Sequence, residues 1–227
     1  MPVAVRGWRM GFPVDEHAEY RPLSTLAKLL AGVFGFALAL DLLLAALTGR
    51  VLARLGTHPS VLNGFTPADV ASLVRIVHAG STISFIWWFR RAYGNLPALG
   101  HARHHGVGWS IGAWFVPILN LFRPKQIAIE LWAAGDPPAP PPDPPGLVGW
   151  WWGIFLFRVW MDARASTPAR PQTLGEFQTS LLLGVASCLV SAAAAAVAIA
   201  LVVRVSNRQD ARAATFSHDC SPSQASR

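Results

Sequence analysis

Three ionisable residues lie inside long apolar stretches of the chain, and they are the first candidates for chemistry. Asp41 interrupts the apolar run from Leu23 to Leu47, and Arg75 and His78 lie in the run from Pro67 to Phe89. A charge in hydrocarbon costs several kcal/mol and therefore usually finds a partner. If the two runs cross a bilayer as antiparallel helices, Asp41 lies about 9 Å and Arg75 about 4.5 Å from the midplane, on the same side, at ~1.5 Å per residue. We therefore predict an ion pair between Asp41 and Arg75, with His78 one turn along the same face.

This intramembrane polar cluster has two interpretations. Acidic, basic and histidine side chains gather along the proton and ion pathways of transporters. A buried pair can also be a structural clamp that fixes two helices, or the Arg side chain can extend to the membrane surface. We favour the clamp, because a single pair makes a poor relay.

A short motif in the middle of the chain resembles the active-site pattern of serine hydrolases. Residues 108–112 spell G-x-S-x-G, with Ser110 at the centre. A nucleophile elbow needs a strand before the serine, a helix after it, and an acid and a histidine later in the chain. The one histidine downstream is His218, near the C-terminus. We therefore interpret the motif as a coincidence and predict no catalytic residue.

Three histidines form the pattern H-x-x-H-H at His101, His104 and His105. On a helix, residues three or four positions apart share a face and could hold zinc or copper. Neither a cysteine nor a carboxylate lies nearby, however, and the neighbouring arginines oppose a cation. We predict no metal site and no cofactor, and we interpret the motif as a basic turn whose histidines can change charge near neutral pH.

The composition indicates the kind of element that must position these residues. Only 14% of the 227 residues are charged, against roughly 25% in soluble domains. Hydrophobic residues make up 52% and the mean hydropathy is +0.37. These values exclude a disordered protein and a coiled coil, and they argue against a water-soluble enzyme. The net charge of +7 fits cytoplasmic loops that meet anionic lipid better than nucleic-acid binding.

Four stretches are long or apolar enough to be predicted membrane spans, namely residues 23–47, 67–89, 146–161 and 177–203. Residues 106–122 form a fifth apolar run, and charge placement decides whether it crosses. With four spans and the N-terminus inside, thirteen Lys and Arg residues lie inside and four outside; with five spans the counts are nine and eight. The positive-inside rule therefore favours four spans. We predict an all-α integral protein of the plasma (inner) membrane, a four-helix transmembrane bundle with both termini cytoplasmic.

The remaining segments are predicted to lie on the cytoplasmic side. They are an N-terminal segment (1–22), an interfacial element (106–132), a proline-rich linker (136–145) and a disordered tail (204–227). In the interfacial element, Pro117 and Pro124 forbid a continuous helix, and Asn120 and Gln126 could bond the freed backbone groups. We expect a re-entrant or surface-lying element. The tryptophans at 87, 88, 109, 114, 132 and 150–152 are interpreted as an aromatic belt at the membrane surface.

The segment from Trp87 to Gly100, followed by that from Gly108 to Gln126, resembles a bacterial membrane family catalogued as domain of unknown function 4328. The resemblance covers roughly residues 26–203. It implies a multi-span inner-membrane protein, of a kind found largely in actinobacteria, with no established activity and no catalytic residue to transfer. The residues that carry it, and that could form a docking surface, are Trp109, Trp114, Pro117, Asn120, Arg123, Pro124, Gln126, Glu130 and Trp132.

Together these features favour a non-enzymatic membrane scaffold or regulatory subunit that presents its interfacial element to a membrane or cytoplasmic protein. The other expected partners are the lipid bilayer and anionic lipids at its cytoplasmic face, and nucleic acid is not expected. The alternative is a small transporter or channel subunit that uses Asp41, Arg75 and His78. A remote alternative is an intramembrane hydrolase at Ser110.

Overall fold

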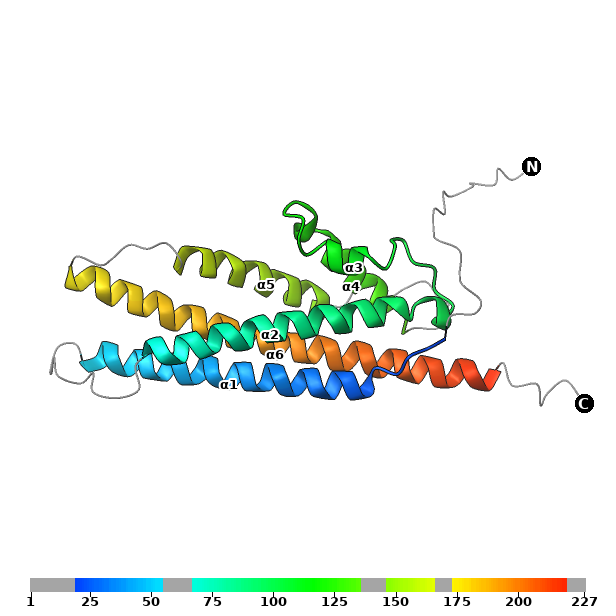
Figure 1. The fold of residues 1–227 in the computed structure, drawn as a ribbon, viewed down its shortest axis with the longest axis horizontal. Helices are drawn as coiled ribbons and strands as arrows, with labels where there is room; N and C mark the ends of the chain where they lie inside the picture. Colours follow the sequence, from blue (N-terminus) through cyan, green and yellow to red (C-terminus); the bar gives the residue numbers. More distant parts are fainter. Residues whose placement is uncertain (1–18, 55–66, 136–145, 166–172, 220–227) are drawn as a thin grey trace, which may run out of the picture.

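The computed structural model describes residues 19–54, 67–135, 146–165 and 173–219, and these residues contain helices but no strand (Figure 1). The predicted all-helical fold is therefore confirmed for this part of the chain. The predicted linker at 136–145 lies outside it, as do residues 1–18 and 220–227. The long helices are α1 (Ser24–Arg54), α2 (Pro67–Gly94), α5 (Gly146–Ala165) and α6 (Leu174–Asp219). The short ones are η1 (Pro97–Leu99), α3 (Trp109–Gly112), η2 (Leu119–Leu121) and α4 (Arg123–Ala133).

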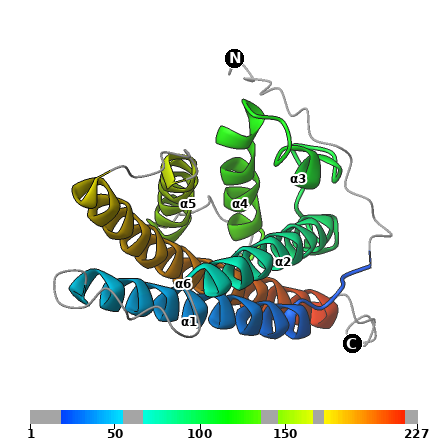
Figure 2. The same cartoon turned by 60° about the vertical axis from the view of Figure 1, so that its left-hand side comes forward.

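The four long helices form an antiparallel bundle built on the contact between α1 and α6. Small residues make that contact close, because alanines of both helices are buried: Ala27, Ala37 and Ala45 on α1, and Ala192, Ala195 and Ala198 on α6. Helix α2 packs on α1, and α5 packs on α6. As Figure 2 shows, α2 and α5 therefore stand apart over the α1–α6 layer.

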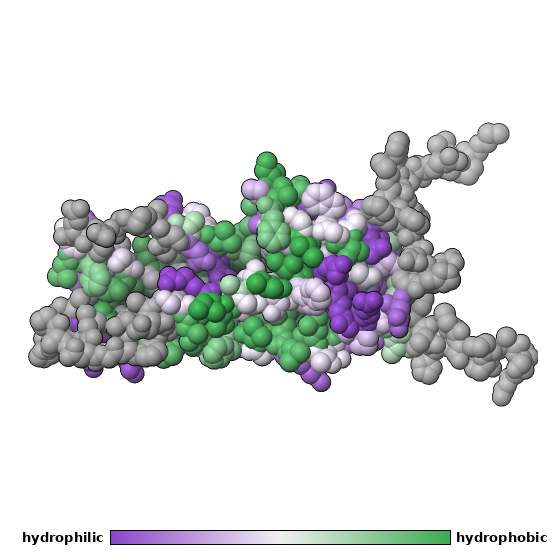
Figure 3. Space-filling view, in the orientation of Figure 1, coloured by the Kyte–Doolittle hydropathy of each residue, from purple (hydrophilic) through white to green (hydrophobic). Residues whose placement is uncertain are grey.

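Two helices are long and apolar enough to cross a membrane, α1 and the part of α6 from Leu174 to Thr215. By length and composition they suggest that the protein associates with a membrane. Helices α2 and α5 lie where spans were predicted but carry more charge, including Arg75 and Arg158. Hydrophobic side chains cover the middle of the bundle, and hydrophilic ones gather over the C-terminal end of α2 (Figure 3).

Helix α6 continues well beyond the predicted end of the last span. The prediction of a disordered tail from residue 204 is wrong as far as Asp219, the last residue of α6. Val205 and Gln209 are buried on one face of the extension. Asp210 accepts hydrogen bonds from the Tyr20 hydroxyl and from the Leu23 N–H at 3.0 Å. It thereby places a carboxylate at the start of α1, where the helix dipole favours negative charge.

A cluster of aromatic rings forms the core between α2, α5 and the segment after α3. Its members are Phe85, Trp88, Phe89, Trp114, Trp151, Trp152 and Phe155, with neighbouring ring centroids 5.2–6.5 Å apart. The aromatic-belt interpretation is thus wrong for Trp88, Trp151 and Trp152, which are buried. Buried indoles need a hydrogen-bond acceptor, and Trp88 donates to Ser206 at 3.0 Å while Trp152 donates to the Leu121 carbonyl at 3.2 Å.

Candidate functional site

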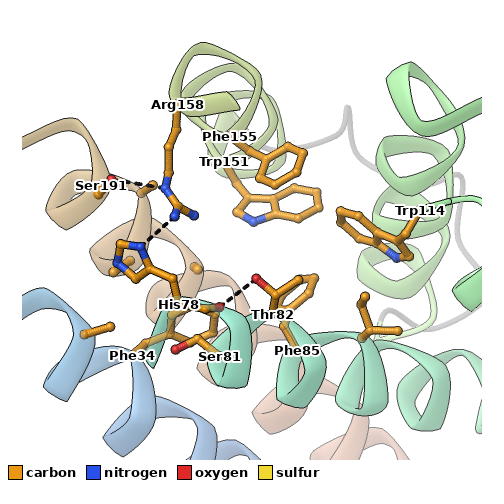
Figure 4. Close-up of a pocket in the computed structure, with 15 residues that line it drawn as sticks. Phe34, His78, Ser81, Thr82, Phe85, Trp114, Trp151, Phe155, Arg158 and Ser191 are labelled. Carbon is orange, nitrogen blue, oxygen red and sulfur yellow. Dashed lines mark hydrogen bonds between the residues drawn. The ribbon is translucent and has the colours of Figure 1, made fainter. Parts of the chain in front are cut away.

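The candidate site is a chain of polar side chains that joins all four long helices. Asp41 on α1 is 1% exposed, and its Oδ2 lies 3.1 Å from Nε2 of His78 on α2. The other ring nitrogen of His78, Nδ1, lies 2.8 Å from Nη2 of Arg158 on α5. Nε of Arg158 donates to Ser191 Oγ on α6 at 3.1 Å. Figure 4 shows Arg158 directed at both His78 and Ser191.

The geometry determines how the His78 proton is placed. Arg158 can only donate hydrogen bonds, so Nδ1 of His78 accepts and carries no proton. The remaining proton of the neutral ring is then on Nε2, which donates to Asp41. The hydrogen bonds of the polar chain therefore all run in one direction, with Arg158 donating to His78 and His78 donating to Asp41.

A second carboxylate stabilises the Arg158 end of this chain. Oδ2 of Asp162, one turn further along α5, lies 3.6 Å from Arg158 Nε. Oδ1 of Asp162 accepts from the Ser187 hydroxyl of α6 at 3.2 Å. The polar chain therefore contains carboxylates on α1 and α5, with a guanidinium and an imidazole between them.

The structure gives Asp41 a different partner from the one predicted. Arg75 is exposed and donates to Ser72 Oγ, on its own helix, at 3.1 Å. Within the described residues, Asp41 forms a hydrogen bond with His78, and the expected ion pair with Arg75 is not formed. Sequence reasoning missed Arg158 as a site residue. The available signal was an arginine near the end of a predicted span that had no assigned partner.

A pocket lies beside the polar chain, between α2, α5 and α6. Helices α2 and α6 each contribute residues spaced i, i+3, i+4 and i+7, which lie on one helical face. Helix α5 contributes three residues at spacings of four and three. Figure 4 shows Trp151, Phe155, Trp114 and Phe85 toward one side, and His78, Arg158 and Ser191 toward the other. The lining is His78, Ser81, Thr82 and Phe85 from α2; Trp151, Phe155 and Arg158 from α5; Ser191, Ala194, Ala195 and Ala198 from α6; and Phe34, Ala37, Ile86 and Trp114.

The size and the access of the pocket follow from its lining. The alanines of α1 and α6 are too short to fill the space between α2 and α5, which do not pack closely on each other. The cavity of about 70 Å³ has room for several water molecules, at roughly 10–15 Å³ each. Trp114 closes one end by packing edge to face against Phe85 and Phe155. The pocket is thus amphipathic, with an aromatic end and a guanidinium end.

The predicted interfacial element is a series of short helices, and several of its motif residues point into the bundle. Trp114 packs in the aromatic core and donates to the Ser110 carbonyl at 3.1 Å. Pro124 is buried in the first turn of α4, where proline is tolerated. Glu130 accepts from the Tyr93 hydroxyl at 2.9 Å. Trp132 lies under the Arg208 guanidinium, 4.6 Å from the ring centroid.

Several residues of the segment from Phe115 to Phe122 are exposed and apolar. Phe115 and Ile118 are each 74% exposed, and Phe122 is 60% exposed. Trp109 and Pro117 are exposed as well. The segment between α3 and α4 stands out from the bundle in Figure 1. Such a surface fits lipid or another protein better than water.

Two expected hydrogen bonds of this element are absent. Asn120 Oδ1 is buried and accepts no hydrogen bond from the described residues, so Asn120 does not bond the backbone freed by the prolines through this atom. Gln126 Oε1 instead accepts from Arg123 Nη1 at 3.4 Å. The broken helix is tolerated because its turns form short-range backbone bonds, such as Asn120 N–H to the Val116 carbonyl at 2.8 Å.

The histidine motif forms part of a contact between α2 and α4. His104 Nδ1 lies 3.4 Å from Glu130 Oε2. The backbone N–H of His105 donates to the Tyr93 hydroxyl at 3.0 Å, and Arg123 donates to the His105 ring. Partial burial and the Arg123 charge lower the pKa of His105 below its ordinary value. No group of three potential metal ligands occurs among the described residues.

The serine of the G-x-S-x-G motif is fully buried. Ser110 Oγ donates to the Val107 carbonyl at 2.7 Å. The helix that contains it, α3, has only four residues, and no strand precedes it in the described part of the chain. This geometry lacks the exposed hydroxyl and the strand on which a nucleophile elbow depends.

The fold and the site define a helical bundle with a polar chain and an amphipathic pocket inside it. Two of its helices are long and apolar enough to cross a membrane. The chain belongs to the family described as Domain of unknown function (DUF4328), whose model matches residues 67–207. The predicted family is thereby confirmed. The match extends from α2 into α6, so that His78, Arg158 and Ser191 lie inside it and Asp41 lies outside. No curated protein and no solved structure matches the chain.

Proposed function

We propose that this protein is a non-enzymatic, four-span protein of the plasma membrane that binds an apolar or amphipathic molecule in the pocket between α2 and α5. The observation that carries the proposal is the pocket itself, which combines an aromatic end with the guanidinium of Arg158. Ligand sites are typically apolar cavities with a few well-placed polar groups that fix orientation. The other donors of Arg158 face the pocket, so the ligand would present a hydrogen-bond acceptor there.

Access to the pocket supports a ligand that comes from the bilayer. Helices α2 and α5 border the pocket without packing closely on each other. In a four-span arrangement the space between them faces lipid rather than water. Exposed apolar side chains on the outer faces of both helices, Ile76 and Ile83 on α2 and Phe157 and Trp160 on α5, fit the same environment.

A regulatory or scaffold role is a narrower form of this proposal. Trp114 contacts the pocket and belongs to the element whose segment from Phe115 to Phe122 is exposed and apolar. A bound ligand would press on Trp114 and could thereby change how this segment meets a partner subunit. Proteins that act in this way need no catalytic residue.

The binding proposal can be tested with a photoactivatable fatty acid incorporated into nanodiscs that contain the whole protein. We expect cross-links at pocket residues such as Thr82 and Phe155. Ala194→Leu fills the pocket and should abolish these cross-links. Ala193→Leu adds the same volume to the neighbouring exposed position of α6, outside the pocket, and should leave them unchanged.

Two outcomes would count against the binding proposal. Cross-links confined to lipid-facing residues such as Ile76 and Ile83 would show that the pocket is closed to chains from the bilayer. Equal pocket labelling in the two leucine variants would show that the label does not report on occupancy of the pocket.

The second candidate function is a small transporter or channel subunit. It is favoured by the connected chain of Asp41, His78 and Arg158, because acidic, basic and histidine groups in a membrane domain often mark a proton or ion pathway. In proteoliposomes, an Asp41→Asn variant that folds normally should then lose ion or proton flux. A pure binding protein shows no flux before or after this change.

A further inference from the structure

A second pocket lies at the C-terminal end of α2, away from the candidate site. It has a volume of about 300 Å³ and a polar lining. Three arginines border it, Arg21 from the segment before α1 and Arg90 and Arg91 from α2. The other residues around it are Glu19, Trp87, Gly94, Asn95 and Val107.

The pocket is held in shape by a buried asparagine. Asn95 is 2% exposed. Its Nδ2 donates to the Arg21 carbonyl at 2.8 Å, and its Oδ1 accepts from the Arg21 N–H at 3.1 Å. These two bonds fix the backbone of Arg21 against the end of α2, although the residues are 74 positions apart in the chain. The fold therefore holds Arg21 beside the end of α2, and Arg21, Arg90 and Arg91 line one pocket.

The charge of the pocket is predominantly positive. Its lining contains three arginines and one acidic residue, Glu19. The Nε atom of Arg91 is buried, and no described residue accepts a hydrogen bond from it. Guanidinium groups recognise phosphate oxygens through pairs of parallel hydrogen bonds. The lining thus fits an oxyanion with several acceptor oxygens.

The position of the pocket on the bundle indicates where that oxyanion comes from. Trp87, which lines the pocket, is 59% exposed. Tryptophan is enriched at the headgroup level of membranes. One turn earlier on α2, Ile83 is exposed and apolar. Figure 3 shows hydrophilic side chains over this end of α2, next to the hydrophobic middle of the bundle. The pocket therefore begins where the apolar surface ends.

We propose that this pocket binds the phosphodiester headgroup of an anionic phospholipid through Arg21, Arg90 and Arg91. The acyl chains of the lipid lie along the apolar surface of α2 beyond Trp87. Inorganic phosphate offers the same oxygens without the chains. The site is independent of the pocket between α2 and α5, and it requires only that the bundle is inserted in a bilayer.

The test compares full-length protein in nanodiscs of equal amounts of phosphatidylglycerol and phosphatidylcholine, with retained lipids counted by native mass spectrometry. The wild type should retain phosphatidylglycerol in preference. Loss of a hydrogen bond to a charged group weakens binding by on the order of tenfold, so Arg90→Gln with Arg91→Gln should reduce the preference at least by roughly that factor. The matched control, Lys125→Gln with Arg204→Gln, removes the same charge from exposed positions outside the pocket and should change the preference little.

A second variant covers the case in which the glutamine variant fails to fold. Arg90→Lys with Arg91→Lys keeps both charges but removes the planar donor pairs, and it should weaken retention of phosphatidylglycerol while the protein stays folded. Equal loss of preference in the pocket and control variants would overturn the site. Thermal stabilisation of the lipid-free, detergent-solubilised protein by inorganic phosphate as strong as that by phosphatidylglycerol would overturn the lipid as its ligand.

Discussion

Asp41 is the most deeply buried charged side chain of the candidate site, and its surroundings explain how it can be there. A buried carboxylate is tolerated when it is paired and hydrogen-bonded. His78 supplies the hydrogen bond to Asp41. Arg158, which is bonded to the other side of the His78 ring, supplies positive charge. The network therefore fixes α1, α2 and α5 relative to one another while leaving donors of Arg158 directed at the pocket.

The coupling between Asp41 and His78 is a prediction at the scale of single residues. In a double-mutant cycle on thermal or denaturant unfolding, Asp41→Asn and His78→Gln should be non-additive by about 0.5–3 kcal/mol, as contacting residues are. The control cycle pairs Asp41→Asn with Arg75→Gln. Because Arg75 is exposed and bonded to Ser72, those two changes should add. The reverse pattern would restore the Arg75 pairing and contradict the structure.

The error over Arg75 shows what sequence reasoning can and cannot supply at this scale. The depth estimate placed Asp41 closer to the level of Arg75 than to that of His78, whereas the structure pairs Asp41 with His78. Direction around the helix was not available, because residues 75 and 78 lie about 60° apart on a helix of 3.6 residues per turn. Only one of two such side chains points directly at α1. Arg158 was missed for a related reason, since α5 is far away in sequence from both Asp41 and His78.

At the scale of elements, the segment from α3 to α4 is the part of the fold in which packing overrides local appearance. Its tryptophans resemble a surface belt in the sequence, yet Trp114 is a central member of the aromatic core. The segment is anchored at α4, where Tyr93, Glu130, His104 and His105 meet. The anchor contains titratable groups and is therefore sensitive to pH.

His105 should make this anchor weaker at acidic pH. Its pKa is lowered in the folded protein from an ordinary value of about 6.5, so the unfolded chain binds more protons between that value and the folded pKa. The stabilising contribution is full above about pH 6.5 and is lost as the pH falls toward the lower folded pKa. The protection factors of the amides in residues 123–133, which correct hydrogen exchange for its intrinsic pH dependence, should fall over this window, and His105→Gln should remove that part of the pH dependence.

His104 provides the control for that experiment. The His104 side chain is exposed beside Glu130, whereas the His105 ring is bonded to Arg123. His104→Gln should therefore leave the acid-induced loss of protection in place. Loss of protection that persists in the His105→Gln variant but disappears with His104→Gln would contradict the assignment of the pH sensitivity to His105.

The long helices were predictable because uncharged runs and helix-start signals mark them directly. Helix α2 begins at Pro67, the residue expected at its first position. The end of α6 was not predictable from hydropathy. Residues 204–219 have the composition of a polar tail, but one face of this extension is buried against the start of α1. That contact joins residues 187 positions apart, and no local pattern reports it.

At the scale of the whole molecule, the bundle is asymmetric. The contact between α1 and α6 is close because alanines line it, whereas α2 and α5 diverge and leave the pocket between them. The polar chain crosses this space and compensates for the missing helix contact with hydrogen bonds. A bundle with larger residues at Ala194, Ala195 and Ala198 would have no such cavity. The small side chains of α6 therefore create the pocket that lies between α2 and α5.

The number of membrane crossings decides whether the space between α2 and α5 faces lipid. The accessibility of single introduced cysteines measures that number. With Cys188 and Cys220 replaced by serine, we expect an impermeant maleimide on intact cells to label Arg54→Cys and Glu176→Cys. Lys125→Cys and Arg212→Cys should react only after permeabilisation. Lys125 is decisive: four crossings place it with the termini inside, whereas crossing by α1 and α6 alone would place it outside with Arg54 and Glu176. Labelling of Lys125→Cys on intact cells would therefore remove α2 and α5 from the membrane, and with them the lipid access that the proposed ligand requires.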